Sequence, residues 1–351
     1  MEIEYALRVI IRMLERINLI ALVLSVFIVW NMITFFLFAW DKHCAIKNRR
    51  RVPEGILICC ALLSGGVGAY LAMKLFRHKT KKLKFKLLVP LSVLIALIPL
   101  VHIAHAVTLD RVVVYREISF SSENWPSELD GYRIGFMSDF HAITVEGMRD
   151  IADELSVRDL DLLVLGGDFS SVTEGRYRET LSVISTIYTR DGIFGVEGNH
   201  DDYVRLFAAK EDYGIIPLSN SGSHIRPHFY LAGVEDYWLR SPSIEEAIAH
   251  ANDEDFIILI THNPDLAMSG DTSGLDLILS GHTHGGQITF FGWAFYLYRG
   301  SITNYNTRFA RGWAESYHGV PIYTSVGVGP EYEWPRVFAR PEVIIFTMHS
   351  A

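Results

Sequence analysis

The chain has 351 residues, of which 50% are hydrophobic and 21% are charged. Its mean hydropathy of +0.20 is high for a wholly soluble protein, and its length allows two domains or one domain with a membrane part. All three cysteines lie within the first 60 residues, and the composition excludes disordered, collagen-like and disulfide-braced chains. Residues 1–105 carry 15 basic and 5 acidic side chains, whereas residues 106–351 carry 17 and 35. The acidic part is a poor match for nucleic acid and is suited to binding metal cations.

The basic first third contains three long stretches without Asp, Glu, Lys or Arg, over residues 17–40, 55–73 and 87–109. About 20 helical residues cross the hydrocarbon core of a bilayer. We therefore expect a membrane domain over residues 1–109 with about three transmembrane helices, rather than buried helices of a soluble fold. A linker and first strand are expected over residues 110–127, followed by a second domain over residues 128–351.

Lys and Arg are enriched in cytoplasmic loops and so predict the orientation of such a domain. Five basic residues follow the first stretch and seven follow the second, although the loops of a chain that crosses three times should alternate. Either the N-terminal tail and the second loop are cytoplasmic, or a middle segment broken at residues 64–68 is re-entrant. In both cases the last stretch leads outward. We expect a multi-pass protein of the bacterial cell membrane with its second domain on the outer face.

Short motifs in this region resemble those of a small bacterial membrane domain of unknown function. They are Trp40-Asp41-Lys42, Arg50-Arg51-Val52-Pro53-Glu54, Gly65-Gly66-Val67-Gly68 and Arg77-His78-Lys79-Thr80. The resemblance covers about residues 20–105 and implies a membrane location without an activity. His102 and His105 lie one turn apart near the end of the third stretch, where we interpret them as helix-end residues at the membrane interface.

From about residue 110 onward, short apolar runs alternate with polar segments of helical periodicity, which predicts an α/β domain. The runs predicted as strands are 111–115, 132–137, 162–165, 192–196, 229–232, 256–260, 275–279, 322–326 and 343–347. The segments predicted as helices are 145–155, 177–187 and 244–251. Several strands lead directly into turns with Asp, Asn or His, at the place where α/β sheets carry their chemistry.

Five such turns concentrate the polar residues of the domain. They are Ser138-Asp139-Phe140-His141, Gly166-Gly167-Asp168, Glu197-Gly198-Asn199-His200-Asp201, Thr261-His262-Asn263-Pro264 and Ser280-Gly281-His282-Thr283-His284-Gly285-Gly286-Gln287. Carboxylate and imidazole ligands suit borderline divalent ions such as Mn, Fe, Zn or Co. Alternate residues of an extended turn share a face, and a carboxylate can bridge two ions about 3.5–4 Å apart. The turns therefore predict a site for two divalent metal ions.

The order of these turns is similar to the motif set of the calcineurin-like metallophosphoesterases, which reads DxH, GD, GNHD, a later H and GHxH. Flanking residues of this chain resemble the membrane-associated YaeI/YkuE-like branch, at 213–215, 231–233, 262–265, 277–280 and 340–342. The match spans roughly residues 128–349. It implies a fold of the α/β class with α+β layers, in which helices flank a β-sandwich. It also implies a hydrolase acting on phosphoric ester or pyrophosphate bonds.

The resemblance further implies a role for each residue of the site. The implied ligands are Asp139, His141 and His284 for the first ion, Asn199, His262 and His282 for the second, and Asp168 as the bridge between both. His200 would face the phosphate as an acid or charge stabiliser for the leaving group. Asp201 would orient His200. Ser171 stands where many members have a further Asp, at a position that is not a metal ligand.

Two features outside the turns have more than one interpretation. Residues 290–299 are rich in aromatic side chains and are either packed core or a wall that faces the membrane or binds acyl chains. Arg336 and Arg340 could reach a phosphate, although we expect each to lie at the surface.

The preferred function is a membrane-anchored, dinuclear metal-dependent phosphoesterase. Related enzymes cleave UDP-2,3-diacylglucosamine in lipid A synthesis, so the resemblance implies an amphiphilic nucleotide-lipid or other lipid-linked phosphate as substrate. That reaction needs cytosolic access, whereas an outer-face domain suits a non-lipid phosphodiester of the cell envelope or a lipid-linked phosphate. A non-catalytic metal-binding sensor or scaffold is the alternative, and the complete ligand set argues against it. The expected partners are the lipid bilayer and a phosphorylated substrate; the oligomeric state stays open.

Overall fold

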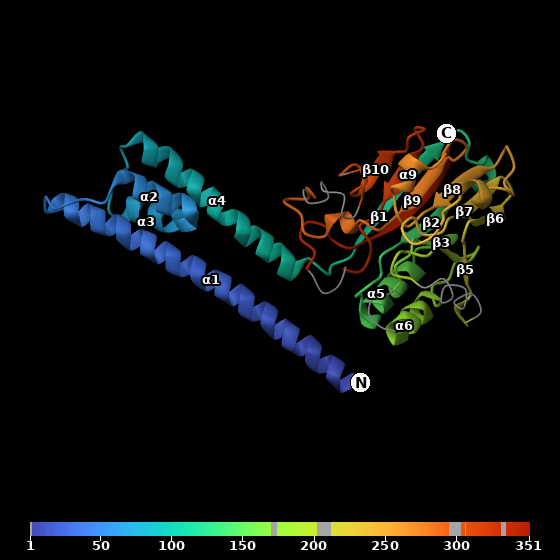
Figure 1. Cartoon of the computed structure of the whole chain (residues 1–351), viewed down its shortest axis with the longest axis horizontal. Coiled ribbons are helices and arrows are strands. Elements are labelled where there is room, and N and C mark those ends of the chain that lie inside the picture. The colour runs from blue at the N-terminus through green and yellow to red at the C-terminus, as the bar shows by residue number, and fades with distance from the viewer. Residues whose placement is uncertain (1, 170–173, 202–211, 295–302, 306, 331–334) are drawn as a thin grey trace. The chain divides into compact units, whose positions relative to one another are not determined.

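The computed structural model describes residues 2–169, 174–201, 212–294, 303–305, 307–330 and 335–351 (Figure 1). The chain divides into two compact units, residues 1–104 and 105–351.

The N-terminal unit is helical. Its helices are α1 (Glu2–Ile46), α2 (Glu54–Cys60), the π-helical η1 (Ala61–Gly65), α3 (Gly66–Leu75) and α4 (Leu83–Thr108), which continues into the second unit. In the described part of the chain, three segments are long and apolar enough to cross a membrane: Ala21–Ile46, Glu54–Leu75 and Leu83–Thr108. The prediction of three long apolar helices is confirmed, and their ends lie a few residues from the predicted ones.

The middle segment is broken at its centre. Leu63 (φ −78°, ψ 44°) and Ser64 (φ 70°, ψ 8°) leave the helical conformation. The Asn31 side chain of α1 donates to the Ser64 carbonyl and accepts from the Gly68 N–H, each at 2.9 Å. Backbone groups released inside a bilayer must find protein partners. Asn31 therefore supplies the bonds that a continuous helix would have made.

The two ends of this segment are joined by ion pairs. The Glu54 carboxylate at its start pairs with Lys79, at 2.9 Å, and with Lys82. The buried Asp41 carboxylate of α1 contacts Arg51 at 2.8 Å and His78 at 2.7 Å. The loop before the segment and the loop after it consequently lie side by side.

The second unit contains two mixed sheets. In the described part, the first has the order β1-β12-β2-β3-β4-β5 and the second the order β10-β11-β9-β8-β7-β6. The strands of the first sheet are β1 (Val114–Ser122), β2 (Tyr132–Met137), β3 (Leu162–Leu165), β4 (Ile193–Gly195), β5 (Ile215–Pro217) and β12 (Glu342–Ser350). Those of the second sheet are β6 (Ser221–Arg226), β7 (Phe229–Gly233), β8 (Phe256–Ile260), β9 (Leu277–Ser280), β10 (Gly312–Glu315) and β11 (Pro321–Thr324).

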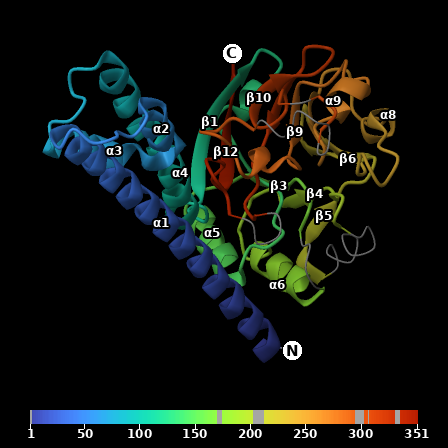
Figure 2. The ribbon, with the colours of Figure 1, turned by 60° about the vertical axis from the view of Figure 1, so that its left-hand side comes forward.

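Helices cover the outer faces of the sheets, as Figure 2 shows for α5 and α6 on the first and α8 and α9 on the second. The short and long helices of this unit are η2 (Ser127–Leu129), α5 (Val145–Ser156), α6 (Glu174–Ile184), α8 (Ile244–Ala247), α9 (Leu266–Ser269) and η3 (His284–Gly286). Successive side chains of a strand point to opposite faces. In β3, Leu162 and Val164 therefore pack between the sheets, while Leu163 and Leu165 pack beneath the helices. The predicted helix-flanked sandwich is confirmed.

The sequence-based prediction differs from the structure mainly at the edges of the sheets. All nine predicted strands overlap observed ones, but β5, β6 and β10 were not predicted, and β1 extends well beyond the predicted run at residues 111–115. These four strands are the edges of the two sheets. An edge strand buries less of its surface, so β1 and β6 lack the continuous apolar run that marks a central strand. The helix predicted over residues 244–251 is also wrong in length, because α8 ends at Ala247.

The core between the sheets provides a test of this architecture. Phe346 of β12 is fully buried and contacts the ring of Tyr323 at 5.6 Å. We expect Phe346→Ala to lower the free energy of unfolding by about 3–5 kcal/mol, because it leaves a cavity between the sheets. Thermal or denaturant unfolding of the purified protein measures the loss. The exposed Tyr188→Ala should change stability by about 0.5 kcal/mol at most. Equal stability of both variants would contradict the sandwich core.

Candidate metal centre

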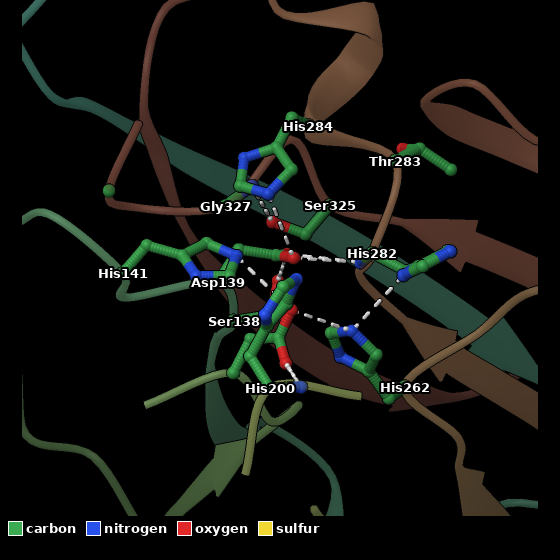
Figure 3. A network of polar contacts seen from close by, with 12 residues as sticks. Ser138, Asp139, His141, His200, His262, His282, Thr283, His284, Ser325 and Gly327 are labelled. Carbon is green, nitrogen blue, oxygen red and sulfur yellow. Dashed lines mark hydrogen bonds and ion pairs between the residues drawn. The ribbon is translucent and has the colours of Figure 1, made fainter. Parts of the chain in front are cut away.

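The five turns meet where strands of both sheets end. Asp139 and His141 follow β2, Asp168 follows β3, and the loop with His200 follows β4. In the second sheet, His262 follows β8, and His282 and His284 follow β9. Figure 3 shows the labelled aspartate and histidines of these turns gathered from the two sheets around one place.

Among the described residues, two buried clusters could each hold a metal ion. The first consists of Asp139, His141 and His284, and the second of Asp168, His262 and His282; within each, the ligand atoms lie within 4.8 Å of one another. Asp168 Oδ2 lies 3.1 Å from Nε2 of both His141 and His262. One carboxylate oxygen therefore faces a histidine of each cluster, which is the position that a bridging ligand needs.

Asn199 and His200 lie beside these clusters. The Asn199 side-chain oxygen is buried, and the His200 side chain is exposed. The His200 backbone N–H donates to Asp168 Oδ1 at 2.8 Å, and its ring lies 5.1 Å from the ring of His141. His200 thus stands at the open side of the site, next to the residues that could bind metal.

The unsatisfied polar atoms test whether this site fits metal ions. Nδ1 of His141 and Oδ1 of Asn199 are buried without a hydrogen-bond partner among the described residues. Leaving a buried polar atom unpaired costs about 1–3 kcal/mol, and coordination to a cation would satisfy it. Carboxylate, imidazole and amide ligands suit divalent transition metals. The residues fit a dinuclear site, and the ligand types do not select one metal.

Neighbouring groups orient the ligands. The His262 Nδ1 lies 2.7 Å from the Gly166 carbonyl and donates to it, which turns Nε2 toward Asp168 and His282 as the nitrogen that could bind a metal ion. Asp139 accepts hydrogen bonds from the Ser138 hydroxyl at 2.6 Å and the His282 N–H at 2.9 Å. These contacts fix both side chains toward the centre of the site.

Arg336 is a supporting residue, and the expectation that it lies at the surface is wrong. It is fully buried rather than at the surface. Its guanidinium lies 3.2 Å from His284 Nδ1 and donates to the carbonyls of Gly329 and Ala339. No motif marks this arginine, because it approaches His284 from 52 positions further along the chain.

Asp201 holds the loops of the site together. Its carboxylate accepts from the backbone N–H groups of Asp168 at 2.6 Å, Phe169 at 2.9 Å and Gly198 at 2.8 Å. The predicted role of orienting His200 stays a prediction. The contacts are with backbone, so we infer that any such effect acts through the loop that carries His200.

Burial and charge determine the protonation of the clusters. Burial raises the pKa of the Asp139 carboxyl. Burial also opposes ionisation of Asp168, but the neighbouring His262 and His141 outweigh it and hold the pKa of Asp168 well below its usual range. Burial, His141 and Arg336 lower the pKa of His284, which keeps its imidazole neutral. The charge of Asp168 outweighs burial at the two histidines that face it, raising the pKa of His141 and raising that of His262 to about 10. A metal ion would therefore have to displace a proton from each of these imidazoles.

The backbone of the turns is strained. Asp139, His141, Asp168, His282 and His284 all have φ between 23° and 72°. For residues other than glycine this left-handed conformation costs about 1–2 kcal/mol each. Such strain persists only where the surroundings over-determine it, which is common at functional sites.

Trp238 is a further neighbour that no motif predicted. Its ring meets the edge of His282 with centroids 4.4 Å apart, and its backbone N–H donates to Asp236 Oδ1 at 2.9 Å. Ser171 and residues 295–299, singled out in the sequence, lie outside the described residues.

Gly327 tests how closely the turns must pack. Its φ is 76°, and a Cβ placed on it would lie 2.5 Å from Cβ of Asp139. We expect Gly327→Ala to displace Asp139 and to reduce the amount of metal that copurifies with the protein. Gly131 has a similar φ of 81° but open space around it, so Gly131→Ala introduces the backbone strain alone. Elemental analysis of both variants should show the loss only for Gly327→Ala; an equal metal content would contradict the close packing.

Comparison with known proteins agrees with this geometry. Residues 132–286 match the calcineurin-like phosphoesterase family, and residues 31–85 match a protein family of unknown function, DUF1294. The uncharacterized metallophosphoesterase YkuE of Bacillus subtilis is 29% identical over 255 residues, which cover 67% of this chain and 85% of that protein.

Two further relatives extend the comparison. The uncharacterized metallophosphoesterase Cj0846 of Campylobacter jejuni is 24% identical over 84% of this chain and 79% of its own length. A transmembrane protein with metallophosphoesterase domain from Danio rerio is 29% identical over 49% of this chain and 44% of its own length. The family model covers every residue of both clusters. The chain therefore carries a calcineurin-like phosphoesterase domain behind an N-terminal DUF1294 region.

Proposed function

We propose that the chain is a membrane-anchored phosphoesterase that uses two divalent metal ions to hydrolyse a phosphodiester or pyrophosphate bond. The observation that carries the proposal is the position of Asp168, whose Oδ2 lies 3.1 Å from a histidine of each cluster. We propose Asp139, His141 and His284 as ligands of one ion and Asn199, His262 and His282 as ligands of the other, with Asp168 between them. Mn, Fe, Zn and Co are the ions that these ligands favour.

A bound metal pair supplies positive charge and an acidified water for attack on phosphorus. The residues of the chain position and protonate the substrate. His200 is exposed beside the clusters, so its imidazole is placed to contact a phosphate and to donate a proton to the leaving oxygen. The bond from its backbone N–H to Asp168 Oδ1 keeps the ring near the bridging carboxylate.

Loss of His200 and loss of Asp168 should have different effects. We expect His200→Ala to retain both metals and to lower kcat by about 10²–10⁴-fold. Asp168→Asn should lose metal and activity together, because the substitution weakens the binding of both ions. Hydrolysis of bis-p-nitrophenyl phosphate by the full chain in detergent, metal-free and then with Mn, Zn or Co, measures activity. The metal content is measured alongside.

The rival function gives a different result in the same assay. A protein that binds two ions yet hydrolyses nothing with any metal would contradict the enzyme and favour a metal-binding sensor or scaffold. An active His200→Ala variant would contradict the role proposed for that histidine and leave the metal site standing.

We propose a lipid-linked phosphodiester or pyrophosphate as the substrate class. Three candidate membrane-spanning helices precede the catalytic unit, which confines the site to the neighbourhood of a bilayer. A substrate of the UDP-2,3-diacylglucosamine type requires the cytosolic side, and a cell-envelope substrate requires the outer side. The orientation of the chain therefore decides between them.

We propose that the catalytic unit lies on the outer face of the cell membrane. The ion pairs of Glu54 with Lys79 and Lys82 place the loops on either side of the middle segment at the same end of the helical unit. Both loops are rich in Lys and Arg and favour the cytoplasm. A re-entrant middle segment, broken at Ser64, allows both to lie there, and α4 then leads outward.

Cysteine labelling tests this orientation. In a variant with the three native cysteines replaced by serine, Tyr188→Cys places a thiol on the catalytic unit and Lys81→Cys places one in a basic loop. Both side chains are exposed. A membrane-impermeant maleimide should label Tyr188→Cys in intact cells and Lys81→Cys only after permeabilisation. The reverse pattern would contradict the outer location and favour a cytosolic substrate.

A further inference from the structure

A group of large apolar side chains is exposed directly after the last turn of the metal centre. The exposed fractions are 39% for Ile288, 45% for Phe290, 51% for Phe291 and 56% for Trp293. Single exposed apolar residues are ordinary, whereas a contiguous set indicates an interaction surface. We refer to Phe290–Trp293 as the aromatic turn.

The aromatic turn has an unusual backbone for its sequence. Phe290 and Trp293 exchange two backbone hydrogen bonds of 3.0 Å, and the two residues between them, Phe291 and Gly292, have φ of 50° and 91°. Such two-residue turns prefer Asn, Asp or Gly at the first of these positions. The Gly292 N–H donates to the Thr289 hydroxyl at 2.9 Å, and Arg311 donates to the Gly292 carbonyl. The fold thus holds a half-exposed phenylalanine in a strained conformation.

Contacts within the second unit place this turn beside the end of α4. The ring of Phe291 lies 5.1 Å from that of Phe338, which lies 4.4 Å from the ring of His105. The Phe338 N–H also donates to His105 Nδ1 at 3.3 Å. His105 belongs to the last turn of α4, the end of a candidate membrane span. The turn therefore lies beside the last turn of a candidate membrane span.

The same segment connects the aromatic turn to the metal centre. Arg336, two residues before Phe338, contacts the ring of His284 at 3.2 Å. The Val337 N–H donates to the Gln287 carbonyl at 2.7 Å, which pairs this segment with the start of the turn. The segment of Arg336–Phe338 thus links the aromatic turn both to His105 and to the site.

We infer that the aromatic turn inserts into the interfacial layer of the bilayer that α4 crosses. Amphipathic and aromatic rings favour the depth of the lipid headgroups, and continuity with the end of α4 brings the turn to that depth. The energy of burying the rings in lipid also offsets the strain at Phe291. The surface binds lipid rather than a protein partner and holds the metal centre at the headgroups. That last consequence rests on the proposed function.

Tryptophan quenching tests the insertion directly. The full chain is reconstituted in nanodiscs of plain phosphatidylcholine or of phosphatidylcholine brominated near the headgroup end of its acyl chains. The fluorescence lost on Trp293→Phe reports Trp293 alone, and we expect brominated lipid to quench at least half of it. Trp313→Phe is the matched control, since Trp313 is 45% exposed on β10 and stacks on Phe120; its signal should not be quenched. Equal Trp293 emission in both lipids would overturn the inference.

Phe291→Asn tests the consequence for catalysis. Asparagine tolerates the left-handed conformation, so the variant should fold with unchanged or raised thermal stability. We expect unchanged hydrolysis of water-soluble bis-p-nitrophenyl phosphate. Hydrolysis of a lipid phosphodiester presented in vesicles should fall about tenfold, because one buried ring contributes roughly that much to interfacial binding.

The other outcomes separate the two proposals. An equal loss on both substrates would show that the turn shapes the site, and no loss on either would show that it is not needed at the membrane. Either result overturns the catalytic consequence. A wild-type chain that hydrolyses neither substrate would contradict the proposed function, and the quenching measurement would still decide the insertion.

Discussion

The structure depends on bringing a single carboxylate, that of Asp168, between histidines from both clusters. Asp168 follows β3 of the first sheet, whereas His262 follows β8 of the second, so the two sheets must pack with the ends of these strands together. The left-handed backbone of the turns opposes this arrangement. The hydrogen bonds that Asp201 accepts and the buried guanidinium of Arg336 stabilise it. The hydrophobic core between the sheets thus positions the side chains of the two clusters as well as the strands.

Much of the fold and the site could be predicted from the sequence, because the information is local there. The central strands are continuous apolar runs, and the turns that follow them carry their ligands within a few residues. Arg336 and Trp238 could not be found in this way, since each reaches the site from a distant segment. The edge strands were not predicted for a different reason. Their half-exposed faces carry polar residues, as the run Ser221–Arg226 shows.

In the helical unit, too, contacts between distant segments could not be predicted from the sequence. Charge counts left two topologies open, because they record how many basic residues a loop has and not where it lies. The bonds from Asn31 to Ser64 and Gly68 connect positions more than 30 residues apart. Only the folded arrangement shows that one side chain of α1 replaces the broken helical ladder. The ion pairs of Asp41 and Glu54 show likewise which loops are neighbours.

The place of β12 in the first sheet has a consequence for biosynthesis. Residues 342–350 lie between β1 and β2, pairing in parallel with one and antiparallel with the other. The sheet therefore stays split until the last described residues have left the ribosome, long after α4 has been made. Contacts this distant in sequence form slowly. Until then the apolar strand β2 has a neighbour only on the side of β3, and β1 lacks the partner it has in the finished sheet, which makes the nascent chain a client for chaperones at the membrane.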